Sequence, residues 1–158
     1  MFGLFKAKKQ TIVSPADGDV VDLSEVPDQV FSEKMAGDGI ALIPRSNTFV
    51  APIAGVVSKI FSTNHAYSIK AKNGLEVLVH IGLETVALKG EGFKRLVEEG
   101  KKVTIGTPII SADLEYIQLE GKNIITPIVL NHDKELILEI QNVRTVREGE
   151  SLLEVTLK

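Results

Sequence analysis

The sequence contains no cysteine among its 158 residues and few aromatic residues, at 5%. The lack of cysteine excludes disulfides, thiolate zinc sites, iron–sulfur clusters and cysteine nucleophiles. With 18 basic and 21 acidic residues the net charge is −3, and no basic stripe interleaved with aromatic residues occurs. Nucleic acid is therefore not an expected partner. Any covalent chemistry must use a nucleophile other than cysteine.

Long apolar runs are also missing from the sequence. No segment approaches the length of a membrane span. Residues 1–9 contain apolar and basic side chains but lack the uninterrupted apolar core of a secretory signal. We therefore expect a soluble, cytoplasmic protein. Residues 1–11 are expected to form a flexible tail, with peripheral membrane contact through Phe2, Leu4 and Phe5 as the alternative.

The length and composition indicate one globular domain. A chain of 158 residues can bury a core without covalent cross-links. Its 44% hydrophobic and 25% charged residues are ordinary values for a folded protein. Because no linker interrupts the pattern, residues 12–158 are expected to form a single domain.

Short runs rich in β-branched residues, separated by Gly, Pro, Asn or Asp, dominate the chain. This spacing predicts an all-β fold, an antiparallel sandwich or barrel-sandwich hybrid with one or two short helices. Only residues 92–99 have a helical pattern, with Phe93, Leu96 and Val97 on one side and Gly100 as a stop. The predicted strand runs are 12–13, 20–21, 40–43, 56–57, 67–69, 77–81, 109–110, 124–125, 136–138 and 152–155.

Two weak internal repeats indicate that the β architecture is duplicated. Val-Ser-Pro-Ala-Asp-Gly-Asp-Val at 13–20 recurs as Val-Ala-Pro-Ile-Ala-Gly-Val-Val at 50–57. Val-Glu-Glu-Gly at 97–100 recurs as Val-Arg-Glu-Gly at 146–149. In the first repeat, proline fixes φ at a strand edge and glycine permits the following turn. The same strand–turn–strand unit is thus expected twice.

His80 interrupts the most apolar predicted strand, residues 75–83. Period-two alternation places His80 and Leu78 on one face of this strand. The carbonyl of Gly82 can accept a hydrogen bond from Nδ1 of His80, which leaves Nε2 with a free lone pair. His80 is therefore the strongest candidate for chemistry. The opposite face of the strand carries Val77, Val79 and Ile81.

The other two histidines differ in context. His132 lies in a polar turn sequence and is expected to be a solvated turn residue. If residues 61–67 are extended, Thr63 and His65 share a face and can hydrogen-bond. Should His65 and His80 meet, two chemistries stay open. One is a metal site with only two evident ligands, and the other is histidine phosphorylation, with one ring attacking phosphorus and the other donating to the phosphoryl oxygens.

The source of a phosphoryl group lies outside the chain. Neither the Gly-rich loop with Lys and Ser or Thr of nucleotide-binding proteins nor the set of protein-kinase motifs is present. A phosphoryl donor must therefore be another molecule.

Residues 30–41, 49–56, 63–67 and 79–86 closely resemble the glucose-type IIA family of the bacterial sugar phosphotransferase system. The resemblance runs in order over residues 12–157. It implies an antiparallel β sandwich that needs no metal or cofactor. It also implies that phospho-HPr phosphorylates His80 on Nε2, and that the phosphoryl group then passes to a cysteine on the IIB domain of a sugar permease.

The resemblance also implies roles for neighbouring residues. His65 would support the phosphoryl group, Thr63 would orient the His65 ring, and regulatory targets would be further partners. Around these residues we expect a partner-binding rim, whose apolar members exclude water and whose acidic members attract a basic donor. The predicted rim consists of Asp28, Val30, Phe31, Met35, Asp38, Phe61, Leu78, Glu84 and Val86. Glu84 stands where the family most often has aspartate, which makes its pairing with a donor arginine less certain.

Two other classes of protein compete with this interpretation. A binding module on a biotinyl- or lipoyl-like β scaffold would need a lysine at a hairpin tip in a Met-Lys-Met-like setting, which the sequence lacks. A zinc hydrolase would need a third metal ligand and a placed acid or base.

Overall fold

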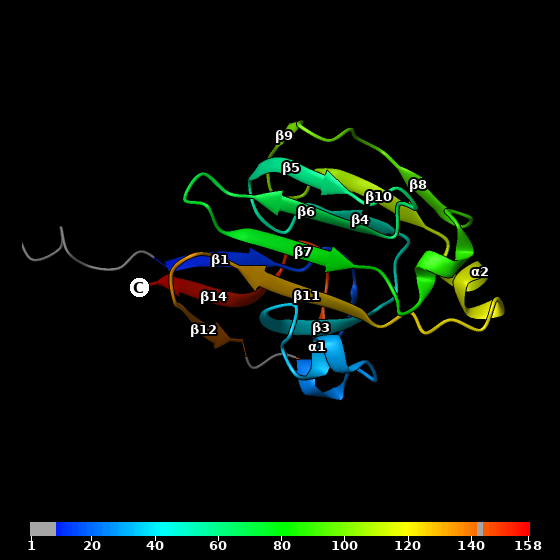
Figure 1. Ribbon diagram of the computed structural model, residues 1–158, viewed down its shortest axis with the longest axis horizontal. Coiled ribbons are helices and arrows are strands. Elements are labelled where there is room, and N and C mark those ends of the chain that lie inside the picture. Colours follow the sequence, from blue (N-terminus) through cyan, green and yellow to red (C-terminus); the bar gives the residue numbers. More distant parts are fainter. Residues whose placement is uncertain (1–8, 142–143) are drawn as a thin grey trace, which may run out of the picture.

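The computed structural model describes residues 9–141 and 144–158, which form three antiparallel sheets with short helical segments in the connections between strands (Figure 1). None of the sheets closes into a barrel. The predicted all-β antiparallel fold is therefore confirmed. The largest sheet has the order β13 (Thr145–Val146), β2 (Gly18–Val21), β3 (Asp38–Pro44), β11 (Thr126–Asn131), β7 (Glu76–His80), β6 (Ala66–Lys70), β5 (Gly55–Ile60), β9 (Lys102–Val103).

Two smaller sheets and four helical segments complete the described chain. One sheet has the order β1 (Lys9–Val13), β14 (Ser151–Leu157), β12 (Leu136–Ile140), and the other β4 (Thr48–Val50), β10 (Pro108–Ala112), β8 (Phe93–Arg95). The helical segments are η2 (Leu23–Glu25), α1 (Gln29–Ser32), η3 (Thr85–Leu88) and α2 (Leu114–Leu119).

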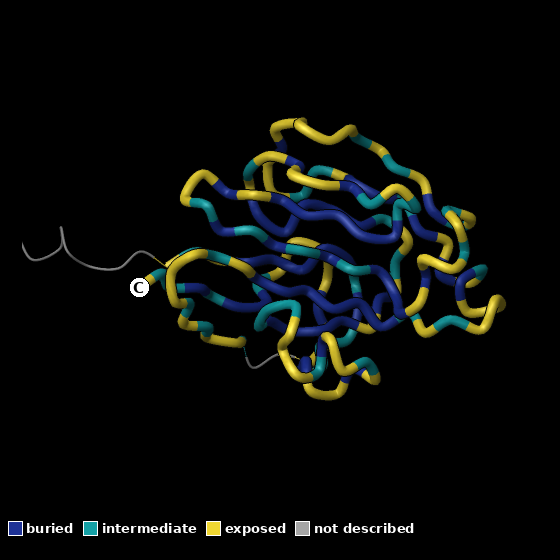
Figure 2. The backbone as a smooth tube through the Cα atoms, viewed as in Figure 1, coloured by how far each residue is buried: buried dark blue, intermediate teal, exposed yellow. Residues whose placement is uncertain are grey.

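The main core joins side chains from all three sheets, and the central strands are buried along most of their length (Figure 2). Ile12 from β1, Ile110 from β10 and Leu42 from β3 are each fully buried in it. Each such side chain contributes about 1.5–3 kcal/mol to the free energy of unfolding.

A second apolar cluster covers the other face of the large sheet. Ala41 of β3 and Val129 of β11 point into this cluster, because alternate residues of a strand point to opposite faces. Leu23 of η2 and Phe31 of α1 pack onto them. The cluster holds α1 against the face of the sheet that carries His80.

The first sequence repeat appears as reciprocal hydrogen bonds between its two copies. The N–H of Val13 donates to the carbonyl of Pro52 at 3.0 Å, and the N–H of Val50 donates to the carbonyl of Pro15 at 2.9 Å. The two strand–turn–strand units therefore pack against each other in equivalent ways.

The second sequence repeat does not correspond to a repeat in the structure. Gly149 donates its N–H to Ser14 at 2.9 Å, and the corresponding bond in the other unit, to Ala51 at 3.0 Å, comes from Gly106. Val146 pairs with Gly18, just as residue 103 pairs with residue 55. Residues 146–149 therefore correspond in space to residues 103–106 and not to 97–100.

The helix predicted over residues 92–99 is wrong. Phe93 and Arg95 lie in β8 and pair with Ala112 and Ile110 of β10. Gly92, with φ of 88°, breaks the helical path just before this strand. Pairing with β10 thus overrides the local helical pattern. The α-helices of the described chain begin instead after Asp28 and Asp113, whose carboxylates cap them.

Two other boundaries differ from the prediction. Residues 124–125 precede β11 and are not part of it. Residues 9–11, expected in the tail, form the start of β1 and pair with β14. The rest of the expected flexible tail, and the alternative of a membrane contact through Phe2, Leu4 and Phe5, fall on residues 1–8, outside the described residues. No helix in the described part of the chain is long and apolar enough to cross a membrane.

Candidate functional site

His80 is the last residue of β7, where it pairs with Ala66 of β6. Val77 and Val79 are fully buried, while Leu78 and His80 on the opposite face are half-buried, as the alternation predicts. Nδ1 of His80 lies 2.7 Å from the carbonyl oxygen of Gly82. A carbonyl can only accept, so Nδ1 donates its N–H and Nε2 of the neutral ring keeps its lone pair.

The loop after β7 fixes the Gly82 carbonyl tightly. Gly82 has φ of 76°, and a Cβ there would lie 2.7 Å from Cγ2 of Thr85 and 2.8 Å from the carbonyl oxygen of Asn123. Leu83 donates its N–H to Asn123 at 2.9 Å, and Thr85 donates its hydroxyl to the Ile81 carbonyl at 2.7 Å. Hydrogen bonds at Ile81 and Leu83, the residues before and after Gly82, therefore hold the carbonyl that accepts from His80.

His65 lies in a turn, so residues 61–67 do not meet the condition of being extended throughout. The turn is closed by hydrogen bonds from Phe61 N–H to the Ala66 carbonyl at 3.0 Å and from Asn64 N–H to the Phe61 carbonyl at 2.7 Å. Asn64 has φ of 58°, a left-handed conformation that asparagine tolerates. Oγ1 of Thr63 nevertheless lies 2.5 Å from Nδ1 of His65. The expected side-chain contact exists on a different backbone.

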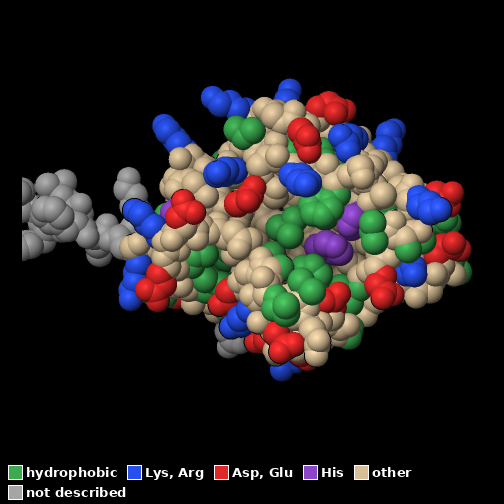
Figure 3. Space-filling model, viewed as in Figure 1, with side chains coloured by type: hydrophobic (Ala, Val, Ile, Leu, Met, Phe, Trp, Pro, Cys, Tyr) green, Lys and Arg blue, Asp and Glu red, His purple; other side chains and the backbone are tan. Residues whose placement is uncertain are grey.

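The turn brings the two imidazoles into contact. Their ring centroids are 5.0 Å apart with an interplanar angle of 80°. Phe31 lies 5.0 Å from the His80 ring, and Phe61 lies 5.3 Å from the His65 ring. Four rings thus form a row, and the space-filling view shows the two adjacent histidines surrounded by apolar side chains (Figure 3).

Both imidazoles are uncharged at neutral pH. Burial, and secondly the nearby His80, lowers the pKa of His65 to about 4. Burial also lowers the pKa of His80, although the hydrogen bond to Gly82 and the charge of Asp28 oppose this shift. A neutral ring with a free Nε2 is a nucleophile, and a neutral ring with an N–H is a hydrogen-bond donor. The pair can supply one of each.

The apolar residues of the predicted rim differ in exposure. Val30, Met35 and Val86 are exposed at 47%, 71% and 55%, and Phe61 and Leu78 are half-buried. Phe31 is only 6% exposed because it packs into the second apolar cluster, and its ring is tilted by 54° relative to that of His80. Phe31 and Phe61 contact the imidazoles directly, whereas the rim role of the others remains a prediction.

The three acidic residues of the predicted rim have different local partners. Asp28 caps α1 by accepting the N–H of Val30 at 2.9 Å. Asp38 pairs with Lys34 at 3.3 Å. Glu84 is exposed and has φ of 57° at the start of η3. The charge of Asp28 opposes the lowering of the pKa of His80.

His132 lies apart from this pair, in the connection between β11 and β12. Its Nε2 is 2.8 Å from the Asn73 carbonyl, and its Nδ1 accepts the N–H of Lys134 at 2.9 Å. This is the turn role that the sequence predicts. Among residues 9–141 and 144–158, no three or more His, Cys, Asp or Glu side chains gather as a metal-binding group.

Sequence reasoning missed two residues at this site. Arg95 contacts the turn that bears His65, and Asn64 provides its left-handed residue. Arg95 lies in residues 92–99, for which the sequence predicts a helix, so its contact with this turn was not expected. For Asn64 the signal was available, since asparagine in a polar segment favours a left-handed turn.

The sequence model of the family described as phosphoenolpyruvate-dependent sugar phosphotransferase system, EIIA 1, matches residues 10–136. The fold and this match define the class, a phosphotransferase component. The chain belongs to this EIIA family, and within it to the glucose type, as the relatives below show.

Three relatives support the assignment. The glucose-specific EIIA component of Buchnera aphidicola is 41% identical over 149 residues, covering 94% of this chain and 92% of the relative. The solved glucose permease IIA of Mycoplasma capricolum has a TM-score of 0.88 at 38% identity, covering 93% and 96%. The N-acetylglucosamine-specific EIICBA component of Klebsiella pneumoniae is 49% identical over 126 residues, which is 80% of this chain but 19% of that protein.

The chain thus spans nearly all of the EIIA relative from Buchnera aphidicola, but about a fifth of the EIICBA relative from Klebsiella pneumoniae. The resemblance found in the sequence is confirmed, and the chain is a phosphocarrier component of the sugar phosphotransferase system. The comparisons lend no support to a biotinyl-like binding module or a zinc hydrolase.

Proposed function

We propose that His80 accepts the phosphoryl group on Nε2 and that His65 stabilises it. The observation that carries this proposal is the fixed hydrogen bond from Nδ1 of His80 to Gly82, with the His65 ring 5.0 Å away. The bond leaves Nε2 as the nucleophile without any proton transfer. Phosphoryl transfer has a loose transition state, so positioning and charge stabilisation carry most of the catalysis.

The reaction moves one phosphoryl group between nitrogen atoms. The donor is the phosphohistidine of HPr, whose P–N bond breaks as a P–Nε2 bond to His80 forms. When the hydroxyl of Thr63 donates to Nδ1 of His65, Nε2 of His65 carries a proton and can donate to the phosphoryl oxygens. In the second transfer, the P–Nε2 bond breaks as a P–S bond to the cysteine thiolate of a IIB domain forms, and the electron pair returns to Nε2 and leaves the His80 ring neutral.

The proposal extends to partners and location. The EIICBA relative joins the matching region to other components of a sugar permease, which supports a permease domain as acceptor. Because HPr and IIB domains act in the cytoplasm, we place this chain there. Residues 9–158 act as a single carrier domain, in which the apolar and acidic rim contacts both partners in turn.

Phosphorylation by purified phosphoenolpyruvate, enzyme I and HPr tests the proposal. The chain should gain one acid-labile, base-stable phosphoryl group, and His80→Ala should gain none. His132→Ala is the matched control and should be labelled like the unchanged protein. Labelling of His80→Ala at the normal level would contradict the assignment.

The same assay separates the roles of the two histidines. His65→Gln should still be labelled, because the nucleophile is intact, but it should pass the group to the IIB domain poorly, since an amide cannot take up charge. Failure of His65→Gln to become labelled at all would contradict a purely supporting role.

A further inference from the structure

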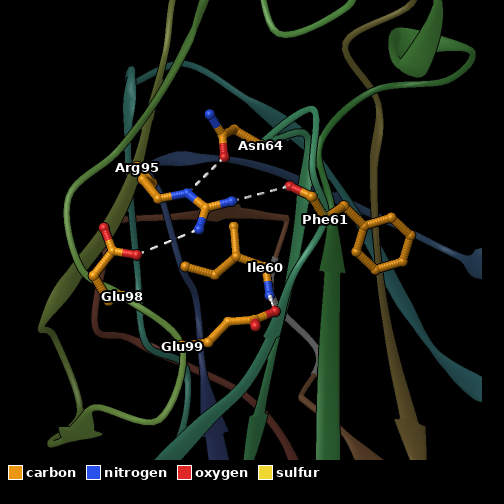
Figure 4. Close-up of polar contacts among 6 residues, drawn as sticks. All are labelled: Ile60, Phe61, Asn64, Arg95, Glu98 and Glu99. Carbon is orange, nitrogen blue, oxygen red and sulfur yellow. Dashed lines mark hydrogen bonds and ion pairs between the residues drawn. The ribbon is translucent and has the colours of Figure 1, made fainter.

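The turn that carries Thr63 and His65 is held by a residue from another sheet. Arg95, the last residue of β8, donates from Nε to Oδ1 of Asn64 at 2.8 Å. A second nitrogen of the same guanidinium donates to the carbonyl oxygen of Phe61 at 3.4 Å (Figure 4). One planar group therefore contacts the first and fourth residues of the turn.

Few other residues could make both contacts. Arginine presents its donors in a rigid fork, whereas lysine has a single flexible ammonium. Hydrogen bonds from a charged donor are stronger than neutral ones, and the Arg95 side chain is only 29% exposed. Its third partner, Glu98, is 3.5 Å away and 80% exposed, so this ion pair contributes little.

The backbone needs such support at this point. Asn64 is left-handed, a conformation that costs energy for any residue with a side chain and persists where neighbours enforce it. Glu99 adds a second contact from the same segment, because its carboxylate accepts the N–H of Ile60 at 2.8 Å (Figure 4). Residues 95–99 thus hold both the end of β5 and the turn that follows.

The turn, in turn, sets the position of His65. Thr63 lies beside Asn64 and contacts Nδ1 of His65, and the ring of Phe61 packs against the His65 ring. The carbonyl of His65 accepts the N–H of Ile81 at 2.8 Å next to the β6–β7 pairing, whereas the contacts of its ring come from the turn. A small rotation of the turn would move the ring away from His80.

We propose that Arg95 is a positioning residue for phosphoryl transfer, holding Phe61 and Asn64 so that Thr63 and His65 stay aligned with His80. This inference rests on the function proposed above. Misplacement of a catalytic group by about 1 Å can lower a rate about 100-fold. Arg95 needs no contact with the phosphoryl group to have an effect of this kind.

The first test compares Arg95→Met with the unchanged protein in transfer from phospho-HPr to His80 and onward to a IIB domain. The maximal transfer rate should fall about 10-fold or more, while the half-saturating HPr concentration changes less than about 2-fold. Arg45→Met removes an arginine that pairs with Asp19 and should transfer normally. Normal transfer by Arg95→Met would overturn the proposal.

Two variants of Asn64 guard against misfolding of Arg95→Met. Asn64→Gly suits the left-handed backbone but removes the side-chain acceptor, and it should show the same defect. Asn64→Asp keeps an acceptor oxygen and should transfer like the unchanged protein. Equal activity of these two variants would show that the Arg95 contact is irrelevant.

A double-mutant cycle tests whether Arg95 acts through His65. In a His65→Gln background, Arg95→Met should cause no further loss, because the ring to be positioned is gone. The same fold-loss in both backgrounds would show that Arg95 acts elsewhere and would overturn the proposal.

A spectroscopic readout separates this proposal from the function itself. In the unphosphorylated protein, nitrogen NMR should show one His65 tautomer, and Arg95→Met should show a mixture, whether or not HPr is the true donor. Unchanged His65 signals in Arg95→Met would overturn the positioning role. If the unchanged protein is never phosphorylated at His80, the proposed function fails instead.

Discussion

His65 and His80 lie side by side, but the hydrogen-bond partners of their Nδ1 atoms differ in kind. A backbone carbonyl fixes Nδ1 of His80, whereas a hydroxyl contacts Nδ1 of His65. A carbonyl can only accept, but a hydroxyl can donate or accept. This difference allows opposite proton positions on the two rings, which is what a nucleophile and a helper require.

The lowered pKa of His65 predicts a pH-dependent stability. His65 titrates near 6.5 when unfolded and at about 4 when folded. Between these values the unfolded chain binds a proton that the folded chain does not, so stability falls as the pH is lowered. His65 should remove about 3 kcal/mol of unfolding free energy between neutral pH and its folded pKa.

Denaturant unfolding at several pH values measures this effect. His65→Gln cannot titrate, so its stability should fall less steeply over the same range. Carboxylates that titrate at low pH affect both proteins and cancel in the difference. Equal slopes for the two proteins would contradict the prediction.

Among the secondary-structure elements, the ends of strands and the connections after them shape the site more than the strands themselves. β7 supplies His80, but the loop after it supplies the carbonyl that orients the ring. β5 and β6 are joined by the turn that supplies Thr63 and leads into His65. The paired strands β5, β6 and β7 thus support the site, and the two connections after β5 and β7 orient its side chains.

Gly82→Ala tests the importance of the loop after β7. The substitution places a Cβ at positive φ and against Thr85 and Asn123, so the carbonyl that holds His80 must move. Gly106→Ala is the matched control, since it has φ of 90° and open space around its Cβ. Gly106→Ala should cost about 1–2 kcal/mol, and Gly82→Ala should cost at least about 1 kcal/mol more.

Phosphoryl transfer distinguishes the two glycine variants further. Gly106→Ala should transfer at the normal rate, because its turn does not contact His80. Gly82→Ala should transfer slowly even at temperatures where it is folded. Equal unfolding midpoints and equal rates for the two variants would contradict the prediction.

The elements show what the sequence could and could not predict. β7 was predictable, because its apolar alternation places His80 opposite Val77 and Val79 whatever lies around it. β8 was not, because its strand conformation comes from pairing with β10, a partner distant in sequence. The turn before His65 depends on Arg95 in the same way. Contacts between distant segments therefore decided most of what was mispredicted.

Buried contacts join the sheets into one domain. Tyr67 of β6 is fully buried in the large sheet, and its hydroxyl donates to the carbonyl of Val50 in β4 at 2.7 Å. The bond links the large sheet to the sheet that contains β4, and its donor lies two residues after His65 in the chain. It should therefore contribute to the stability of the entire domain.

Tyr67→Phe leaves the buried Val50 carbonyl without this donor and should cost about 1–2 kcal/mol. For a chain of this size, the unfolding midpoint should fall by about 2–8 °C. The other tyrosine, Tyr116, bonds Glu91 at 2.6 Å at the surface and provides the matched control. Tyr116→Phe should leave the midpoint unchanged, and an equal shift in both variants would contradict the prediction.

The pairing of β1 with β14 places Lys9 opposite Thr156. This end of the β1–β14 pair lies toward the left in Figure 1, whereas the two adjacent histidines lie right of centre in the same view (Figure 3). A tether attached near either end would leave the imidazoles unobstructed and let the domain reorient between donor and acceptor. The fold accordingly occurs both in a relative of nearly the same length and as a small part of a much longer relative.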